Sequence, residues 1–295
     1  MLKTVHFQVI DDKKLTVGQF LQKHGISNKA ISALKKQDQA LLLNNEPCFT
    51  NRYIQKDDVI TISLNEENHQ ENIVPVKMNL NIVYEDDDLI ILDKGKDCTV
   101  HPSVKYFTCT LANGLAYYFQ SKNQDICIHC ITRLDKDTTG LVLFAKNKFS
   151  AHYLSQMIAK KEIQKTYLAL VQGKPNPEKG TVNAPIGRKE KGNILRAVDF
   201  INGKPAVTHY QLLKYNSTND ISLVKCLLET GRTHQIRVHM LYINHPLIGD
   251  NLYNKNNQQL NRQALHCCQL NFIHPFTKQL LTVYSDIPKD MQELI

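Results

Sequence analysis

The sequence predicts an α+β protein in which a small α/β module precedes a larger body with a mixed, mostly antiparallel β-sheet and flanking helices. Two observations lead to this class. The N-terminal part carries two short amphipathic helical patterns next to apolar runs of strand type, whereas the remainder is dominated by short strand-like runs. A polar stretch at 65–75, which ends at Pro75, separates the two parts and has the composition of a linker. We therefore expect a module at 1–64 and a body at 76–295.

Capping residues and apolar spacing define two helices in the module. Thr16 can cap a helix that runs through His24, and Ser27 can cap a second helix through Gln37. Each helix has one apolar face that would pack inward. The outward positions of the second helix are basic: Lys29, Lys35 and Lys36.

The strands are predicted from short apolar runs bounded by turn residues. In the module, strands are expected at 41–43 and 59–64. Eight runs in the body have the length and composition of strands: 80–84, 89–93, 140–145, 166–172, 206–214, 221–229, 264–273 and 279–284. The apolar spacing from Phe149 to Ile158 predicts a helix, and residues 233–243 predict another.

The composition is that of a globular protein with an excess of positive charge. The chain has 295 residues, of which 42% are hydrophobic and 22% are charged, and its formal net charge is +8. Such a charge favours a polyanionic partner through electrostatic attraction, although many basic proteins have none. No apolar run approaches the roughly 20 residues of a membrane span, and the N-terminus has no apolar signal-peptide core. We therefore expect a cytoplasmic protein without a membrane partner.

The cysteines and histidines do not have the spacing of a metal site. The eight cysteines are scattered, as expected for reduced thiols. Cys127 and Cys130 form a single CxxC pair, whereas a zinc site needs a second pair of ligands. His234 and His239 are five residues apart, not the four that place two histidines on one helical face. We expect no bound metal.

Three segments place charged and polar residues beside apolar strand runs. The first, 133–146, begins with an arginine and an aspartate in a polar loop and continues as an apolar run. The second is 165–169, and the third is 231–239. Loops held by a rigid scaffold are where binding and catalytic side chains gather, so these segments are candidates for one site.

The residue types in these segments suit catalysis on a polar substrate. Asp135 beside an arginine would stay ionised and could act as a nucleophile or general base. Tyr167 could stack on a planar ring, and Arg232 and Arg237 have planar forks that fit carboxylate or phosphate. Spacing alone does not show that these groups meet. His234 fits either such a site or a satisfied position in the core.

In this order, the three segments resemble motifs of the RluA family of RNA pseudouridine synthases. Segment 133–140 is similar to the family's motif around its catalytic aspartate, 165–173 to its tyrosine strand, and 231–239 to its arginine motif. Further similar segments extend the resemblance over residues 80–285. The chain departs from the family's usual residues at Thr132, Gly95 and Asp97.

The resemblance implies an isomerase that turns uridine in RNA into its carbon-linked isomer. It implies that Asp135 engages the sugar or the base, that Arg237 orients Asp135, and that Tyr167 stacks on the uracil and assists proton removal. A second set of residues is expected to contact RNA: Arg133, Lys165, Arg232, His234 and Gln235. The reaction imports no group and oxidises nothing, so no cofactor is expected. Which carbon Asp135 engages stays open.

The N-terminal module resembles, more weakly, the RNA-binding domain first seen in a small-subunit ribosomal protein. Its lysines, Lys29, Lys35 and Lys36, would then contact RNA. Family members with such a module act on large-subunit ribosomal RNA, so we expect that substrate for a monomeric enzyme, with transfer RNA as an alternative. Three other readings stay open: a generic small α/β module, a non-catalytic RNA-binding or ribosome-assembly factor, and a hydrolase that uses Asp135 on a sugar. Glycosidases usually need a second carboxylate, which these motifs do not supply.

Overall fold

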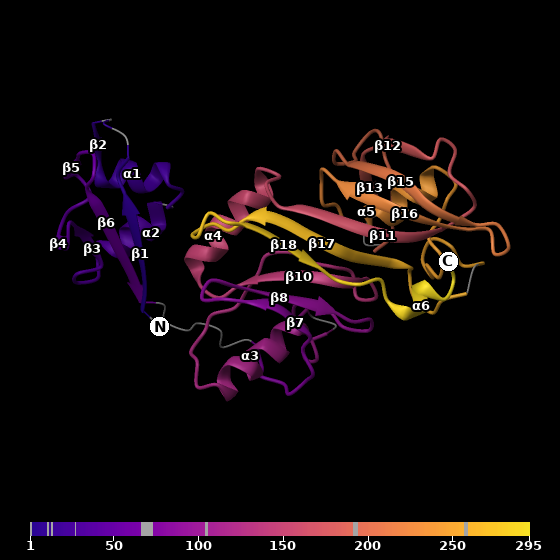
Figure 1. The fold of residues 1–295 in the computed structure, drawn as a ribbon, viewed down its shortest axis with the longest axis horizontal. Coiled ribbons are helices and arrows are strands. Elements are labelled where there is room, and N and C mark those ends of the chain that lie inside the picture. Colours follow the sequence, from indigo (N-terminus) through magenta and orange to yellow (C-terminus); the bar gives the residue numbers. More distant parts are fainter. Residues whose placement is uncertain are drawn as a thin grey trace.

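A small N-terminal module and a larger body built on one long sheet make up the fold (Figure 1). The structure is a computed structural model that describes residues 2–10, 12, 14–26, 28–65, 73–103, 106–190, 194–256 and 259–295. Most of the predicted linker, residues 66–72, lies outside these ranges. Within them, no helix is both long and apolar enough to cross a membrane.

The module is a four-stranded antiparallel sheet with two helices. The strands follow the order β1-β6-β3-β4 and have these bounds: β1 (Leu2–Gln8), β3 (Leu41–Leu43), β4 (Glu46–Pro47) and β6 (Val59–Asn65). A short ribbon pairs β2 (Leu15–Thr16) with β5 (Tyr53–Ile54). The helices are α1 (Val17–Lys23) and α2 (Asn28–Leu34). Phe149 of the body is buried in the core of this module, so the two parts pack together.

The predicted cap of the first helix is confirmed. The Thr16 hydroxyl accepts the backbone N–H of Gln19 at 3.3 Å, and the Gln19 side chain accepts the backbone N–H of Thr16 at 2.9 Å. This reciprocal pair satisfies two donors at the start of the helix.

The second helix is shorter than the prediction. It ends at Leu34 rather than Gln37, so Lys35 and Lys36 follow the helix and are exposed. The expected cap, Ser27, and the side chain of Lys29 lie outside the described residues.

The body is built on a ten-stranded sheet. Its main path is β12-β15-β16-β11-β17-β10-β8-β7, with β18 beside β17 and β9 beside β10. All these pairs are antiparallel except β10 with β17, which is parallel. The bounds are β7 (Ile82–Glu85), β8 (Leu89–Lys94), β9 (His129–Cys130), β10 (Thr139–Ala145), β11 (Gln164–Gln172), β12 (Lys179–Asn183), β15 (Val207–Asn216), β16 (Ile221–Leu228), β17 (Leu265–Ile273) and β18 (Leu280–Tyr284). The predicted mixed, mostly antiparallel sheet is confirmed, with each of the eight predicted strands within two residues of its expected bounds.

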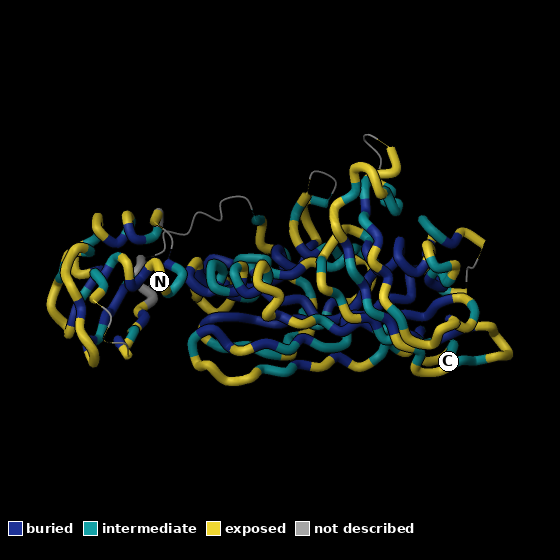
Figure 2. Tube along the Cα trace, turned by 90° about the horizontal axis from the view of Figure 1, so that it is seen from above, coloured by how far each residue is buried: buried dark blue, intermediate teal, exposed yellow. Residues whose placement is uncertain are grey.

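Helices cover both faces of the central strands, which explains why these strands are apolar throughout. The helices are α3 (Leu111–Ser121), α4 (Lys148–Ala159), α5 (Gln235–Tyr242) and α6 (Lys289–Gln292). On β8, Ile90 and Leu92 pack in the cluster that contains α3, whereas Leu89 and Ile91 pack in the cluster that contains α4. Successive strand residues point to opposite faces, so a strand buried on both sides has no polar alternation. Figure 2 shows this buried layer running through the body.

Helices α4 and α5 confirm the two helices predicted for the body, whereas α3 and α6 were not expected. The first turn of α3 carries Asn113 and Gly114, which have low helix propensity. A capping box between Thr110 and Asn113 starts this helix instead.

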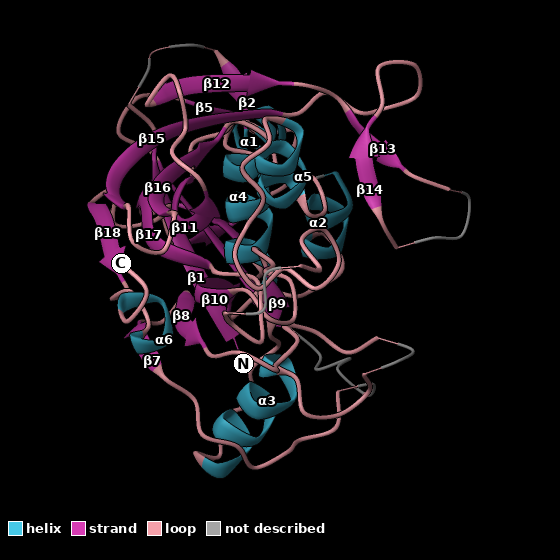
Figure 3. Ribbon diagram, turned by 90° about the vertical axis from the view of Figure 1, so that its right-hand side faces the viewer, coloured by secondary structure: helices cyan, strands magenta, loops and turns pink. Residues whose placement is uncertain are grey.

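A short hairpin stands beside the main sheet (Figure 3). It pairs β13 (Ile186–Arg188) with β14 (Arg196–Val198). Each strand has only three residues, which is too few for an apolar pattern to reveal it. Ile186 packs against Val238 of α5, so the base of the hairpin is fixed to the helix that follows the third motif.

The start of β10 depends on a glycine. Gly140 has φ of +107°, and a Cβ at this position would lie 2.2 Å from the carbonyl oxygen of Cys267. Gly140 pairs with Cys267 at the parallel junction of β10 and β17. No larger residue fits there without moving one of the two strands.

Gly140→Ala should therefore destabilise the body by more than about 2 kcal/mol, because the alanine is strained at positive φ and collides with backbone. Urea unfolding monitored by circular dichroism measures the change. Gly95→Ala is the matched control, because a Cβ at Gly95 meets nothing within 4 Å. Equal stabilities of the two variants would contradict this account of the junction.

Candidate active site

The three motif segments meet around one cavity of about 410 Å³. The aspartate loop before β10, the start of β11 and the segment that enters α5 each contribute to its wall. The predicted residues that line it are Arg133, Asp135, Lys165, Tyr167, Arg232, His234, Gln235 and Arg237. The structure thus brings together every site residue expected in the body.

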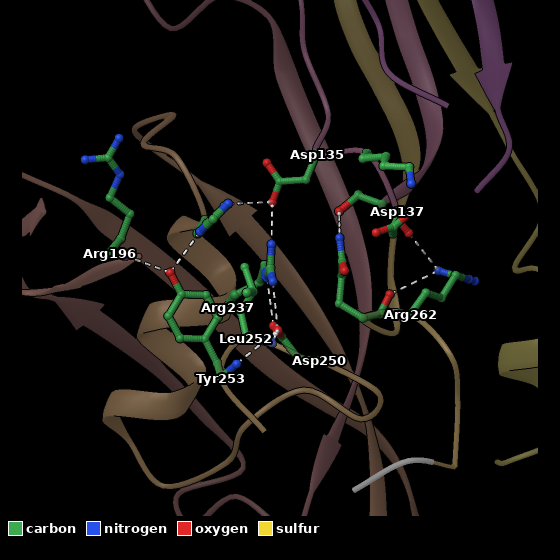
Figure 4. A network of polar contacts seen from close by, with 12 residues as sticks. Asp135, Asp137, Arg196, Arg237, Asp250, Leu252, Tyr253 and Arg262 are labelled. Carbon is green, nitrogen blue, oxygen red and sulfur yellow. Dashed lines mark hydrogen bonds and ion pairs between the residues drawn. The ribbon is translucent and has the colours of Figure 1, made fainter. Parts of the chain in front are cut away.

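Asp135 lies at the centre of a polar network (Figure 4). Its Oδ2 accepts a hydrogen bond from Nη1 of Arg237 at 3.1 Å. Nε2 of His234 is 3.8 Å from the same oxygen. The carboxylate side chain keeps 29% of its surface exposed, so it is oriented by the protein and still open to a ligand.

Arg237 is held by a second carboxylate that was not predicted as a site residue. Its Nε and Nη2 each donate to Asp250 at 2.7 Å, one to each carboxylate oxygen. Burial lowers the pKa of Arg237, but the hydrogen bonds and charges of Asp250 and Asp135 outweigh burial, so this pKa lies above its ordinary value. The bidentate pair fixes the guanidinium plane, and one remaining nitrogen reaches Asp135.

Tyr167 places its ring in the wall of the cavity from β11. The side chain is 5% exposed, and burial raises its pKa well above the ordinary value, helped by Cys267 and by the charge of Asp135. Tyr167 is therefore a neutral phenol at neutral pH. A neutral aromatic ring in this position suits stacking on a planar base.

His234 faces Asp135 rather than the core. It precedes α5 with a left-handed backbone (φ 58°), and its Nδ1 lies 2.8 Å from the hydroxyl of Tyr253. Burial lowers the pKa of His234, which favours a neutral imidazole beside Asp135. Tyr253 also lies under Arg237, whose guanidinium carbon is 5.1 Å from the ring centroid.

The remaining predicted residues fall into two groups. Arg133 and Arg232 are exposed at the cavity, although Nε of Arg232 donates to the carbonyl of Pro205 at 3.0 Å. Lys165 is partly buried, and desolvation lowers its pKa.

Gln235 differs from its expected role as an RNA contact. Its amide oxygen accepts from Thr230 and from the backbone of Arg232, and its amide nitrogen donates to Val207 and Thr208. These partners occupy the side chain within the protein. The geometry favours a supporting role, in which Gln235 shapes the loop that carries Arg232.

Two buried cations hold the backbone that follows Asp135, and neither was predicted. Nζ of Lys94 donates to the carbonyl of Lys136 at 2.6 Å, and to two further carbonyls at 2.9 Å. Arg262 pairs with Asp290 through two contacts of 2.8 Å and reaches the carbonyl of Asp137 at 3.5 Å. The aspartate loop is therefore held by hydrogen bonds to two consecutive carbonyl groups, those of Lys136 and Asp137.

Lys94 is fully buried at the end of β8, with 1% of its surface exposed. Burial lowers its pKa to about 8, although the nearby Cys98, Asp137 and Asp135 raise it. The sequence does not indicate that Lys94 is buried, because a lysine at the end of an apolar strand usually turns to solvent.

One group of possible metal ligands occurs among the described residues, and it lies outside this cavity. Ligand atoms of Asp86, Asp88 and His274 lie within 4.8 Å of one another. Oδ1 of Asp86 accepts the backbone N–H groups of Asp88 and Leu89 at 2.7 and 2.8 Å, and the histidine lies 3.1 Å from Oδ2. These contacts close the turn between β7 and β8.

Comparison with known proteins gives a consistent result. The family model for RNA pseudouridylate synthase matches residues 88–242. The uncharacterized RNA pseudouridine synthase YhcT of Bacillus subtilis is 38% identical over 256 residues, which cover 87% of this chain and 84% of that protein. The ribosomal large subunit pseudouridine synthase D of Nitrosomonas europaea is 41% identical over 240 residues, which cover 78% and 67%. The solved structure of human RNA pseudouridylate synthase domain containing 1 matches with a TM-score of 0.59 and 27% identity over 70% of this chain and 83% of that one.

The fold and the site thus define an enzyme of the pseudouridine synthase class. The chain belongs to the RNA pseudouridylate synthase family, and the resemblance to the RluA family is confirmed. It is an enzyme that isomerises uridine to pseudouridine in RNA.

Lys94→Met should remove the cation while keeping most of the apolar stem. Buried carbonyls then lose their donor, so the free energy of unfolding should fall by about 2–5 kcal/mol. The kcat should fall by a larger factor than the change in the KM for RNA, because the loop that carries Asp135 loosens. Steady-state kinetics and urea unfolding measure the two effects.

The pH dependence of stability supplies a sharper readout for Lys94. Its folded pKa of about 8 lies below the ordinary 10.5, so the unfolded chain binds the proton more tightly between these values. Lys94 therefore makes stability rise as pH increases through this window. Lys94→Met should lose that rise, whereas Lys96→Met, at an exposed lysine of the same loop, should keep it. A rise that persists in Lys94→Met would show that another group causes it.

Proposed function

We propose that this pseudouridine synthase acts on large-subunit ribosomal RNA and that Asp135 is its catalytic carboxylate. The observation that carries the assignment is the position of Asp135, which lies at the cavity and is oriented by an arginine fixed on a buried partner. The relatives named for large-subunit ribosomal RNA support the choice of substrate. The proposal takes the enzyme to be a monomer, and a ribosomal substrate implies a cytoplasmic enzyme.

In this proposal Asp135 engages the target nucleotide while the hydrogen bond from Arg237 orients the carboxylate. The bond between N1 of uracil and C1′ of ribose breaks, the uracil rotates in the cavity, and C5 bonds to C1′. The proton on C5 then leaves, and N1, which has lost its bond to the sugar, takes up a proton. No atom is gained or lost overall, so the chain needs to supply orientation, charge and a surface on which the free base can turn.

Tyr167 supplies that surface. Its buried, neutral ring lines the cavity and can stack on uracil in either orientation, because stacking does not depend on hydrogen-bond register. Proton removal from C5 then passes through the Tyr167 hydroxyl or a water molecule beside it. Lys165 and His234 lie on the same wall and are placed to contact the base or its ribose.

The target uridine must leave its stack to enter a cavity of this size. Base flipping costs a few kcal/mol, and it costs less for a uridine in a loop or bulge than for a paired one. Arg133 is exposed at the cavity and is placed to fill the vacated position or to hold the neighbouring phosphate. Unpaired uridines are therefore the preferred targets.

The N-terminal module is proposed to be an RNA-binding arm spanning residues 1–64, joined by 65–75 to a catalytic domain at 76–295. Its sheet and helices form an apolar core of their own, into which the body inserts Phe149 and against which Tyr153 and Phe276 of the body also pack. Lys35 and Lys36 project from the end of α2 into solvent, where they can reach phosphate groups. Lys29 is assigned to the same surface from the sequence pattern alone.

Asp135→Asn should abolish pseudouridine formation while RNA affinity stays within a few fold, because the shape of the side chain is kept. Pseudouridine is mapped across total RNA from cells that lack the gene and carry either the wild type or the variant. Asp87→Asn, at an exposed carboxylate far from the cavity, is the control and should restore every site. Loss of a transfer RNA position instead of ribosomal positions would overturn the substrate, and conversion by the pure Asp135→Asn protein would overturn the catalytic role.

The double variant Lys35→Gln/Lys36→Gln should weaken RNA binding and reduce its salt dependence. Each lost phosphate contact lowers the slope of log K against log salt by about 0.7 for a single strand, so a decrease of about 1.4 is expected. Lys174→Gln/Lys179→Gln removes the same charge from exposed positions at β12 and should leave the slope unchanged. The same slope for both double variants would exclude the RNA-binding arm.

A further inference from the structure

A second cavity adjoins the first and has no role in the chemistry described above. Its volume is about 550 Å³, and it shares Asp135, His234 and Arg237 with the first cavity. The β13–β14 hairpin contributes Arg188 and Arg196 to its outer wall. A nucleotide that neighbours one in the first cavity would therefore lie at the second.

The two hairpin arginines are arranged in a way that their own contacts do not explain. Arg188 and Arg196 are direct partners in the antiparallel register, so both side chains leave the same face of the hairpin. Like charges opposite each other on two strands are destabilising. Neither guanidinium forms an ion pair within the described part of the chain, so no direct partner there offsets the repulsion.

Arg196 carries a further cost. Its Nε is buried and has no hydrogen-bond partner among the described residues. A buried donor without a partner is costly, and such a group in a native protein calls for an explanation. Figure 4 shows the guanidinium extending away from the Asp135 network, which is joined to Arg196 only through the backbone. A ligand that brings negative charge and several acceptor oxygens would satisfy both arginines.

We propose that Arg188 and Arg196 bind a backbone phosphate of the RNA strand next to the target uridine. This rests on the proposed function, because the strand enters through the first cavity. Two planar forks on the wall of one cavity suit a phosphodiester, which offers two oxygens that share a negative charge to bidentate donors. Ile194 and Leu252 line the same cavity and provide apolar surface for the attached sugar.

The phosphate subsite is linked to the catalytic carboxylate through Tyr253. The Tyr253 hydroxyl accepts the backbone N–H of Arg196 at 2.9 Å and lies 2.8 Å from Nδ1 of His234. Arg237 packs over the same ring and donates to Asp135. A phosphate held by the hairpin therefore has a fixed position relative to Asp135. This position places the sugar of the target nucleotide.

The test measures equilibrium binding of the full chain to a short single-stranded RNA with one central uridine. In a second set of RNAs, single phosphates flanking that uridine are replaced by neutral methylphosphonates. One such replacement should weaken binding to the wild type about tenfold, as expected for loss of a charged hydrogen-bonded contact. The same replacement should have no effect on Arg188→Gln/Arg196→Gln. That variant should also lower the salt slope by about 0.7.

Two further variants keep the test decisive. Arg188→Lys/Arg196→Lys keeps the charge and should keep the salt slope of the wild type. A lower salt slope in this lysine variant would mean that the hairpin is disrupted and would overturn the assignment. Lys179→Gln removes one exposed charge elsewhere and should change neither readout. Equal sensitivity of wild type and Arg188→Gln/Arg196→Gln to every methylphosphonate would also overturn the subsite. Because the readout is binding, these results do not depend on turnover. If the wild type were inactive but still bound the methylphosphonate RNA more weakly, the proposed function would be wrong and the phosphate subsite would stand.

Discussion

The site depends on one buried ion pair, between Arg237 and Asp250. Asp250 has no exposed surface, and both of its oxygens accept from the same guanidinium. A buried charge without a partner is so costly that each residue holds the other in place. The planar fork then leaves a single direction for its remaining nitrogen, and Asp135 lies there. The orientation of Asp135, the proposed catalytic carboxylate, is thus set by a buried contact between two other residues.

The backbone of the loop around Asp135 is held by buried side chains, whereas the side chain of Asp135 faces the cavity. Lys94 and Arg262 hold the carbonyls of the next two residues, and Gln263 donates to Thr138 at 3.1 Å. Donors arranged in advance need no reorganisation when charge develops during the reaction, which is the main way that polar sites accelerate chemistry. The start of β10 is constrained separately, because only glycine at position 140 avoids a clash with the backbone of Cys267.

Much of the fold could be predicted from the sequence, because the central strands are buried on both faces and read as uninterrupted apolar runs. The β13–β14 hairpin and α3 could not be predicted, since the hairpin strands are too short and the first turn of α3 contains Asn113 and Gly114. Asp135, Tyr167 and Arg237 were found because each stands in an ordered motif. Lys94 and Arg262 were missed because their burial follows from long-range packing. Gln235 was assigned to RNA because the sequence does not show the hydrogen bonds that its amide group forms with Thr230, Arg232, Val207 and Thr208.

The contact between Arg262 and Asp290 joins the aspartate loop to the last helix of the body. Residue 135 and residue 290 are separated by half of the chain, yet the loop reaches its final support only when both are present. During synthesis, the motif residues therefore leave the ribosome well before their geometry is complete. Until Arg262 and Asp290 have both been synthesised, the aspartate loop lacks this contact with α6.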